Sequence, residues 1–347
     1  HKLAPNYRHD YDSNMSDLNS EIGSETSPTS AAVSIAVVIP CYREKHQIMT
    51  VLSKFDTLIN HIIVIDDACP DKTGEHVSEN AKDPRIHVII HKKNLGVGGA
   101  TISGYRKAFE LGADIIVKVD GDGQMDPAMI HTLVQPILRG EADYAKGNRF
   151  YRLNGLAKMP GIRLFGNLVL SFASKMSSGY WKIFDPTNGF TAIHRKVAQE
   201  LALDKISNDY FFESDMLFQL NIARAVVADV PIQAIYGEET SSLKISHVMF
   251  PFIAKHLANF LRRILYSYFL RDFSIASIEL IIGLIFIIFG AIFGGLEWYN
   301  STVTGTTASA GTVIIAALPL LVGSQLLISF LNFDVHNQPE RPLHPNL

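Results

Sequence analysis

The sequence predicts an α/β domain built on a mostly parallel sheet, followed by amphipathic juxtamembrane helices and two membrane-spanning helices. Three observations lead to this fold class. Apolar runs alternate with helical segments between residues 34 and 236, a pattern that builds a parallel sheet covered on both faces. A basic helix with one apolar face follows, and two long runs that together carry one charged residue lie near the end of the chain.

Composition restricts the class of protein further. The 347 residues carry 31 Lys and Arg against 34 Asp and Glu, a formal net charge of -3, so nothing in the overall charge favours nucleic-acid binding. Cys41 and Cys69 are the two cysteines, which excludes a disulfide framework and fits a reducing compartment. Residues 1–32 are polar and aperiodic, and we expect a disordered N-terminal tail there.

Four apolar runs are the expected strands of the sheet, and polar residues follow each of them. Their sequences are SIAVVIP (34–40), HIIVIDD (61–67), IHVII (86–90) and ADIIVKVD (113–120). Ligands of parallel α/β sheets bind outside the carboxyl ends of the strands. We therefore expect a site where these four polar loops converge.

The loop after the fourth strand carries alternating oxygen ligands. Asp120, Asp122 and Gln124 are separated by single glycines, and crowded like charge is unfavourable unless a cation is present. Carboxylate and amide oxygens are the ligands that Mg2+ and Mn2+ prefer, often shared with substrate phosphates. The sequence therefore predicts a divalent metal site at this loop, although an isolated Asp-x-Asp pair can also be a solvated turn.

The glycine-rich stretch NLGVGGATISG (94–104) is not a dinucleotide-binding fingerprint. Thr101 stands where the third glycine is required, and the stretch follows the third expected strand instead of the first. Two interpretations remain open: a helix N-terminus that a ligand or the neighbouring strand approaches closely, or a tight turn.

Two membrane-spanning helices are expected within residues 273–333. The run at 273–296 contains only Glu279 as a charged residue, and a second apolar run covers 311–331. At about 1.5 Å per residue, each is long enough for a hydrocarbon core of roughly 30 Å; the alternative is a pair of buried core helices. The connection EWYNSTVTGTTASA has no Lys or Arg, which predicts an inner or plasma membrane location with the N-terminal domain in the cytoplasm.

Residues 244–272 are expected to form amphipathic juxtamembrane helices. Ile253, Leu257 and Leu261 recur at helical spacing, whereas Lys255 and Arg262 fall on the other face. A basic amphipathic helix beside a span is typical of the headgroup region. An ordinary helix packed on the α/β domain is the alternative.

Seven motifs, in this order, resemble those of inverting family 2 glycosyltransferases of the GT-A fold. They are VVIPCYRE (37–44), IDDACPDKTG (65–74), NLGVGGA (94–100), VDGDGQMDP (119–127), GNRF (147–150), DPTNGF (185–190) and FFESDML (211–217). The chain is most similar to the polyprenyl-phosphate branch, which includes dolichol-phosphate mannose synthases and bacterial undecaprenyl-phosphate glucosyltransferases. The resemblance implies a GT-A domain at 33–243 and a C-terminal tail at 334–347.

The resemblance also implies which residues bind the donor. Pro40, Tyr42, Glu44 and Asp67 would line the nucleotide pocket, with Asp67 hydrogen-bonded to the base edge. Asp120 would approach the ribose or the metal. The metal ligands, for Mg2+ or Mn2+, would be Asp120, Asp122 and Gln124.

On the acceptor side, Arg149 and Arg163 are similar in spacing to paired lipid-phosphate-binding arginines, and the alternative for each is a surface arginine. The resemblance implies that Asp122, Asp185 and Asp215 belong to the catalytic centre. A turn residue is the alternative for Asp185, and Asp215 is either a base or a residue that orients a loop or the sugar. Thr191 stands where the mannose enzymes often have Arg, which favours a donor other than a mannose nucleotide.

The expected function is inverting transfer of a hexose-type sugar from a nucleotide donor, expected to be UDP-linked, to undecaprenyl or another polyprenyl phosphate on the cytoplasmic leaflet. The expected partners are this donor, the lipid acceptor, the bilayer and further copies of the chain, with a tetramer plausible. A processive polysaccharide synthase is an alternative, but its Gln-x-x-Arg-Trp motif is absent from the sequence. A non-catalytic scaffold that binds a sugar nucleotide or lipid is the other.

Overall fold

The computed structural model describes residues 33–149, 161–232 and 245–347. The predicted tail at 1–32 lies outside the described residues, as do 150–160 and 233–244. For residues 161–165, 167 and 245–249 the backbone alone is described. The described residues therefore include most of the predicted α/β domain and both predicted spans.

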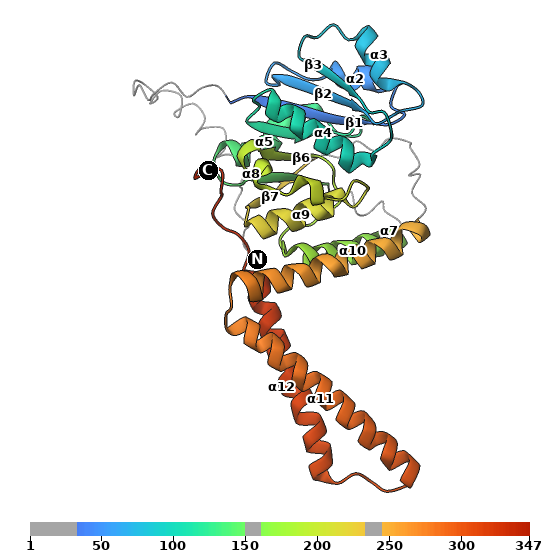
Figure 1. The fold of residues 1–347 in the computed structure, drawn as a ribbon, viewed down its shortest axis with the longest axis vertical. Coiled ribbons are helices and arrows are strands. Elements are labelled where there is room, and N and C mark those ends of the chain that lie inside the picture. Colours follow the sequence, from blue (N-terminus) through green and yellow to red (C-terminus); the bar gives the residue numbers. More distant parts are fainter. Residues whose placement is uncertain (1–32, 150–160, 233–244) are drawn as a thin grey trace, which may run out of the picture. The chain divides into compact units, whose positions relative to one another are not determined.

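A seven-stranded sheet forms the centre of the α/β domain, in the order β3-β2-β1-β4-β6-β5-β7 (Figure 1). β1 is parallel to β2 and β4, β2 to β3, and β5 to β7, whereas β6 is antiparallel to both of its neighbours. The strands are β1 (Ile35–Cys41), β2 (His61–Asp66), β3 (Ile86–Ile90), β4 (Ile115–Lys118), β5 (Tyr144–Asn148), β6 (Thr191–His194) and β7 (Val227–Pro231). The four predicted strands are β1 to β4, so the prediction of a mostly parallel α/β sheet is confirmed.

Helices pack on both faces of this sheet. One core contains side chains from α2, α3 and α5, and the other contains side chains from α4, α8 and α9. Their bounds are α2 (Ile48–Leu52), α3 (Thr73–Asn80), α4 (Gly96–Glu110), α5 (Ile130–Leu138), α8 (Arg195–Glu200) and α9 (Phe212–Ala223), with 3-10 turns at Pro127–Met129 and Leu203–Lys205.

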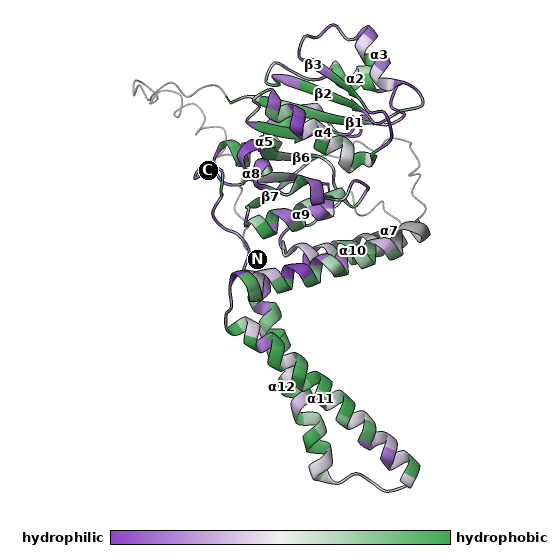
Figure 2. Ribbon diagram, in the orientation of Figure 1, coloured by the Kyte–Doolittle hydropathy of each residue, from purple (hydrophilic) through white to green (hydrophobic). Residues whose placement is uncertain are grey.

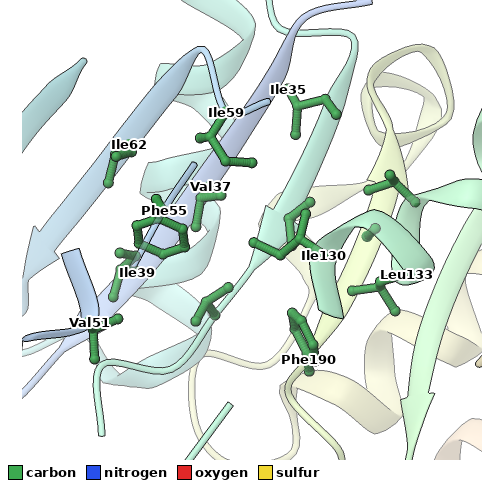
Figure 3. Packing of buried hydrophobic residues seen from close by; sticks show 14 of the residues in the cluster. Ile35, Val37, Ile39, Val51, Phe55, Ile59, Ile62, Ile130, Leu133 and Phe190 are labelled. Atoms are coloured by element: carbon green, nitrogen blue, oxygen red, sulfur yellow. The ribbon is translucent and has the colours of Figure 1, made fainter. Parts of the chain in front are cut away.

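Strand β1 is buried along its whole length because it supplies both cores. Ile35, Val37 and Ile39 pack against the α2 and α5 side (Figure 3), whereas Ala36 and Val38 pack against the α4 side. This is the alternation expected of a strand between two helical layers. Burial of each Val or Ile side chain stabilises the fold by about 1.5–3 kcal/mol, so the carboxyl end of β1 is a rigid platform.

Helix α10 (Ile245–Leu265) is amphipathic, as the sequence predicts, and packs against α7 (Gly161–Ser178). Ile253, Leu257 and Leu261 are each more than half exposed, whereas the polar residues His256 and Asn259 are buried. The usual arrangement of a helix on a soluble domain is therefore reversed, since the apolar stripe faces outward. A π-helical segment, Tyr266–Arg271, continues the chain.

Helices α11 (Ile275–Thr304) and α12 (Ala310–His336) have 30 and 27 residues and are long and apolar enough to cross a membrane. Only 22% of the apolar stretch of α11 and 11% of that of α12 is buried, whereas the core helices of a soluble protein are mostly buried. Figure 2 shows the hydrophobic residues along both helices. The two helices approach closely at glycines: a Cβ on Gly283 would lie 3.2 Å from the Gly323 carbonyl oxygen. Small residues of this kind are typical of helix pairs in membranes.

A buried ion pair joins α10 to α12. Arg263 donates to both carboxylate oxygens of Asp334, at 2.5 and 3.0 Å, and each side chain is at most 3% exposed. Tyr268 and Trp181 donate to the same carboxylate, at 2.6 and 3.1 Å. Because breaking a buried pair leaves an uncompensated charge, this network fixes the end of α12 to the helix that precedes α11.

Beyond α12 the chain returns to the α/β domain. The backbone amides of Leu343 and His344 donate to the buried carboxylate of Asp143, which precedes β5. The His344 ring also contacts Asp143 at 2.9 Å and stacks on His194, with ring centroids 4.4 Å apart. We call residues 337–347 the C-terminal clasp.

Candidate active site

The polar loops predicted to converge do meet at the carboxyl ends of β1 and β4. A Cβ on Gly121, in the acidic loop, would lie 3.1 Å from the Cys41 sulfur and 3.3 Å from Cγ of Glu44. Pro40 is buried in β1, whereas Tyr42 in the following loop is 45% exposed. The predicted nucleotide-binding residues Tyr42 and Glu44 are thus brought to the edge of the sheet that carries the acidic loop.

Asp120, the first acid of this loop, is paired with a buried lysine. The ammonium of Lys118 lies 2.6 Å from Asp120 Oδ1 and 3.3 Å from Glu213 Oε1, and Lys118 is 1% exposed. Burial by itself would lower the pKa of Lys118, but the two carboxylates outweigh it and hold this pKa above its ordinary value. The lysine is therefore a permanent cation inside the site.

Asp122 and Gln124 form the outer part of the same loop. Asp122 Oδ1 accepts from the Gln124 amide at 3.0 Å, and Gly123 between them has φ +72°, a backbone conformation that favours glycine. Both side chains are partly exposed. The alternation read from the sequence thus forms a tight turn whose oxygen-bearing side chains lie partly exposed at the edge of the sheet.

The donor set of this loop fits a cation shared with a substrate. Among the described residues, no three His, Cys, Asp or Glu side chains come together as a metal site. Mg2+ is commonly held by one or two carboxylates and completed by substrate phosphates and water. Asp122, Gln124 and the outer oxygen of Asp120 suit that arrangement, since Lys118 occupies the other Asp120 oxygen.

Asp67, at the end of β2, is held by backbone amides. Its two oxygens accept from Leu95 N at 2.8 Å and Gly96 N at 2.7 Å, and Oδ1 also contacts His91 at 2.7 Å. Its neighbour Asp66 accepts in the same way from the amide of Cys69 and from that of Gly74 at the start of α3. Both carboxylates therefore shape the loops at the proposed nucleotide end.

The glycine-rich segment begins α4 and packs against another loop. The amides of Gly98 and Gly99 donate to the Asn208 carbonyl at 2.8 and 3.3 Å. A Cβ on Gly98 would lie 2.3 Å from the Ser207 carbonyl oxygen, closer than any side chain tolerates. The segment therefore begins a helix that other backbone approaches closely, and this backbone is the loop at Ser207 and Asn208, where a ligand or the neighbouring strand was expected from the sequence.

Asp185 lies in the turn before β6 and is fully buried. Arg149 holds it in a fork, with Nε 2.8 Å from Oδ2 and one terminal nitrogen 3.0 Å from Oδ1. Asn188 Nδ2 adds a contact at 3.2 Å. The two predicted residues are thus partners, and the turn alternative for Asp185 also holds, because its carbonyl accepts from Asn188 N. Arg163 lies on α7, and its side chain is outside the described residues.

Asp215 and Glu213 both lie in the first turn of α9 but contact different parts of the domain. Asp215 accepts from the Ser207 amide at 2.8 Å, from the Ser207 hydroxyl at 2.5 Å and from Asn259 of α10 at 2.6 Å. Glu213 is the α9 carboxylate that contacts Lys118 of the acidic site. The arrangement favours, for Asp215, the alternative of orienting a loop.

Sequence reasoning missed two buried lysines and underrated Glu213. Lys118 and Lys146 pair with the same residue of β6, Thr191, from opposite sides. Lys146 donates to the Asn188 carbonyl, and burial lowers its pKa to about 8, against the opposing effect of Asp185. The signal available in the sequence was Lys118 inside an apolar run, where an unpaired charge is costly; Lys146 lies in the short, polar sequence YAKGN, which offers no such signal.

Known proteins share this fold and its motifs. Residues 36–202 match the family described as Glycosyl transferase family 2. The chain is 33% identical over 221 residues to the UDP-N-acetylglucosamine–dolichyl-phosphate N-acetylglucosaminyltransferase of Methanococcus voltae, covering 59% of this chain and 86% of that protein. It is 28% identical over 208 residues to the undecaprenyl-phosphate mannosyltransferase of Micrococcus luteus, covering 59% and 84%.

Among solved structures, the chain is similar to glucosyl-3-phosphoglycerate synthase from Mycobacterium tuberculosis in complex with Mn2+, UDP and glucosyl-3-phosphoglycerate. The TM-score is 0.50 at 19% identity, with 69% of this chain and 86% of that chain covered. Fold and motifs together define a glycosyltransferase with the GT-A α/β fold. The chain belongs to glycosyltransferase family 2.

Proposed function

We propose that the protein transfers a hexose-type sugar from a nucleotide donor, UDP-linked, to a polyprenyl phosphate, with inversion at the anomeric carbon. The observation that carries this proposal is the meeting of two groups at one sheet edge. One is the Asp122 to Gln124 turn, with its partly exposed side chains; the other is Arg149, held by buried Asp185. The first suits a diphosphate with its cation, and the second suits a phosphate acceptor. Curated relatives named for dolichyl and undecaprenyl phosphate transfer support the acceptor class.

The donor half would bind the nucleotide diphosphate. Pro40, Tyr42, Glu44 and Asp67 line the proposed nucleotide pocket, and Asp120, Asp122 and Gln124 would hold Mg2+ or Mn2+. The cation, when bound, neutralises charge on the departing nucleoside diphosphate. Asp122 and Gln124 orient the diphosphate so that the bond to the sugar points away from the acceptor.

The acceptor half needs positioning more than a strong base. A phosphate monoester, with a second pKa near 6, is already largely ionised at neutral pH. One of its oxygens forms the bond to the anomeric carbon as the carbon–diphosphate bond breaks, and the electron pair leaves with the nucleoside diphosphate. Arg149 and Arg163 bind the acceptor phosphate, while Asp185 fixes the Arg149 guanidinium and Asp215 orients the 207–209 loop.

The apolar helices favour a membrane location for this reaction. We propose that the catalytic domain covers residues 33–243 and faces the cytoplasm, that 244–272 lie in the headgroup region, and that 273–333 cross the bilayer twice. The exposed apolar stripe of α10 supports this arrangement, since it continues to the start of α11. Residues 334–347 would then lie on the cytoplasmic side, and a homo-oligomer would place several acceptor sites on one patch of membrane.

Transfer of radiolabelled sugar in detergent tests the proposal. The wild type is given undecaprenyl phosphate, Mn2+ or Mg2+, and a panel of UDP- and GDP-sugars, beside Asp122→Ala and the control Asp126→Ala. Asp126 belongs to the same loop but caps the following helical turn through Ala128 N. We expect one UDP-sugar to give a metal-dependent lipid product, with a loss of at least about 100-fold in Asp122→Ala and a change below about threefold in Asp126→Ala.

Each other result has a definite meaning. Product that grows into a polymer would favour a processive synthase. Nucleotide binding with no turnover of any donor would favour a scaffold, and equal losses in the two variants would show that the loop fold, not the Asp122 oxygens, limits the reaction.

A further inference from the structure

Lys118 joins three segments of the candidate site. Its ammonium contacts Asp120 of the acidic loop at 2.6 Å, Glu213 of α9 at 3.3 Å and the Gly189 carbonyl of the 185–190 turn at 3.4 Å. A Cβ on Gly189 would lie 2.5 Å from the Lys118 nitrogen and 2.7 Å from Asp120 Oδ2, so a side chain at this position would displace the Lys118–Asp120 pair. These contacts link the donor half of the site to its acceptor half.

Lys146 provides an internal comparison. It has the same chemistry and the same burial, at most 1% exposed, and is paired in register with the same Thr191. Its ammonium, however, donates to the carbonyl of Asn188, whereas that of Lys118 is shared by two carboxylates. Burial therefore does not distinguish the two lysines, but the groups they hold do.

Glu213 is directed to Lys118 by the packing of α9. Asp215, two residues further along, is fixed by Ser207 and by Asn259 of α10. These contacts of Asp215 place the first turn of α9 beside the acidic loop. Glu213 then lies next to Asp120, and the two carboxylates would repel each other without a cation between them. Lys118 supplies that cation whether or not a metal is bound.

We infer that Lys118 and Glu213 are a positioning pair that holds Asp120, and through Gly189 the 185–190 turn, in the geometry needed for sugar transfer. This inference rests on the proposed function and adds residues to it that do not touch the donor. Removal of the Lys118 charge leaves Asp120 free to rotate toward the diphosphate. Misplacement by about 1 Å costs roughly 100-fold in rate, whereas Asp122 and Gln124, which Lys118 does not hold, would still bind the metal–nucleotide complex.

The test compares Lys118→Met with the matched control Lys146→Met and with Glu213→Gln. The rate kcat is measured twice, for transfer to undecaprenyl phosphate and for slow hydrolysis of the donor without lipid, and the affinity for Mn2+ with UDP is measured by calorimetry. We expect kcat to fall about 100-fold in Lys118→Met and about tenfold in Glu213→Gln, with Mn2+–UDP affinity within threefold of wild type. Lys146→Met loses one contact with the Asn188 carbonyl of the 185–190 turn and no carboxylate partner, so we expect its kcat to fall less than about tenfold.

Lys118→Met leaves two carboxylates without their cation, so its melting temperature is recorded beside that of the double variant Lys118→Met/Glu213→Gln. We expect the double variant to recover stability while its kcat stays low. Equal kcat losses at Lys118 and Lys146, or Mn2+–UDP affinity weakened more than tenfold, would overturn the inference. If the wild type hydrolysed the donor but transferred nothing to lipid, only the proposed acceptor would be overturned. The hydrolysis kcat of each variant relative to wild type would still test the role of Lys118 and Glu213.

Discussion

Two sets of carboxylates at the same edge of the sheet are held in different ways. At the end of β2, Asp67 accepts from two backbone amides. Near the ends of β4 and β6, Asp120 and Asp185 are met by the side chains of Lys118 and Arg149. Backbone amides belong to the fold and do not move away, whereas a guanidinium can share its charge with a ligand. We therefore infer that the first set maintains the shape of its loops, whereas the second set positions charged groups that bind the ligands.

Replacement of Arg149 tests the second set most directly, because its guanidinium holds Asp185. Arg149→Lys keeps the charge but loses the two-point contact with Asp185, so the acceptor phosphate is held less accurately. We expect kcat/KM for undecaprenyl phosphate to fall about 100-fold while the KM for the donor changes less than threefold. Steady-state kinetics with each substrate varied in turn give both values.

The matched control is Arg85→Lys, since Arg85 forms a similar fork with Asp83 at the surface. We expect it to transfer sugar as the wild type does. If Arg149→Lys raised the donor KM instead of impairing use of the lipid, Arg149 would belong to the donor half and the division of the site would be wrong.

Asp67→Asn tests the first set. An amide cannot replace both acceptor oxygens, so one of the amides of Leu95 and Gly96 loses its partner, which costs about 1–3 kcal/mol. We expect a melting temperature lowered by about 2–8 °C and weaker UDP binding, because the loop beside the nucleotide moves. Asp71→Asn, an exposed change nearby, should alter neither. A lower melting temperature with unchanged UDP affinity would remove Asp67 from the nucleotide pocket.

The donor half could be predicted from the sequence because its signals are local. Four apolar runs ending in polar residues gave β1 to β4, and the spacing of Asp120, Asp122 and Gln124 lies within one loop. The two long apolar runs likewise predicted α11 and α12. In each case the periodicity or length of a single segment carries the information.

The second half of the sheet was not predicted strand by strand because its strands are short and contain polar residues. β5 reads YAKGN and pairs with β6 and β7, which lie far along the chain. The partners of Lys118 and Arg149 are set by this long-range pairing. A buried lysine needs a partner of opposite charge, and only the fold shows that Glu213 of α9 contacts Lys118, whereas Asp215 contacts Asn259 instead.

Asp143 extends the comparison to the opposite end of the sheet, where the effect expected is smallest. Like Asp67, Asp143 is held by backbone amides, which are those of Leu343 and His344 in the C-terminal clasp. Beside it, burial lowers the pKa of His194 to about 4, helped by the neighbouring His344. The clasp thus favours a neutral ring, whereas an unfolded histidine takes up a proton near pH 6.5.

The sign of the pH dependence follows from this lowered pKa. The unfolded chain binds more protons than the native chain between pH 6.5 and about 4, so the stability of the clasp is complete above pH 6.5 and is lost as the pH falls through that window. His194→Phe keeps an aromatic ring against His344 without titrating. Between pH 7.5 and 5.0 we expect the wild-type melting temperature to fall about 2–4 °C further than that of His194→Phe. Parallel curves for the two proteins would mean that the amides of the clasp hold Asp143 regardless of the charge on His194.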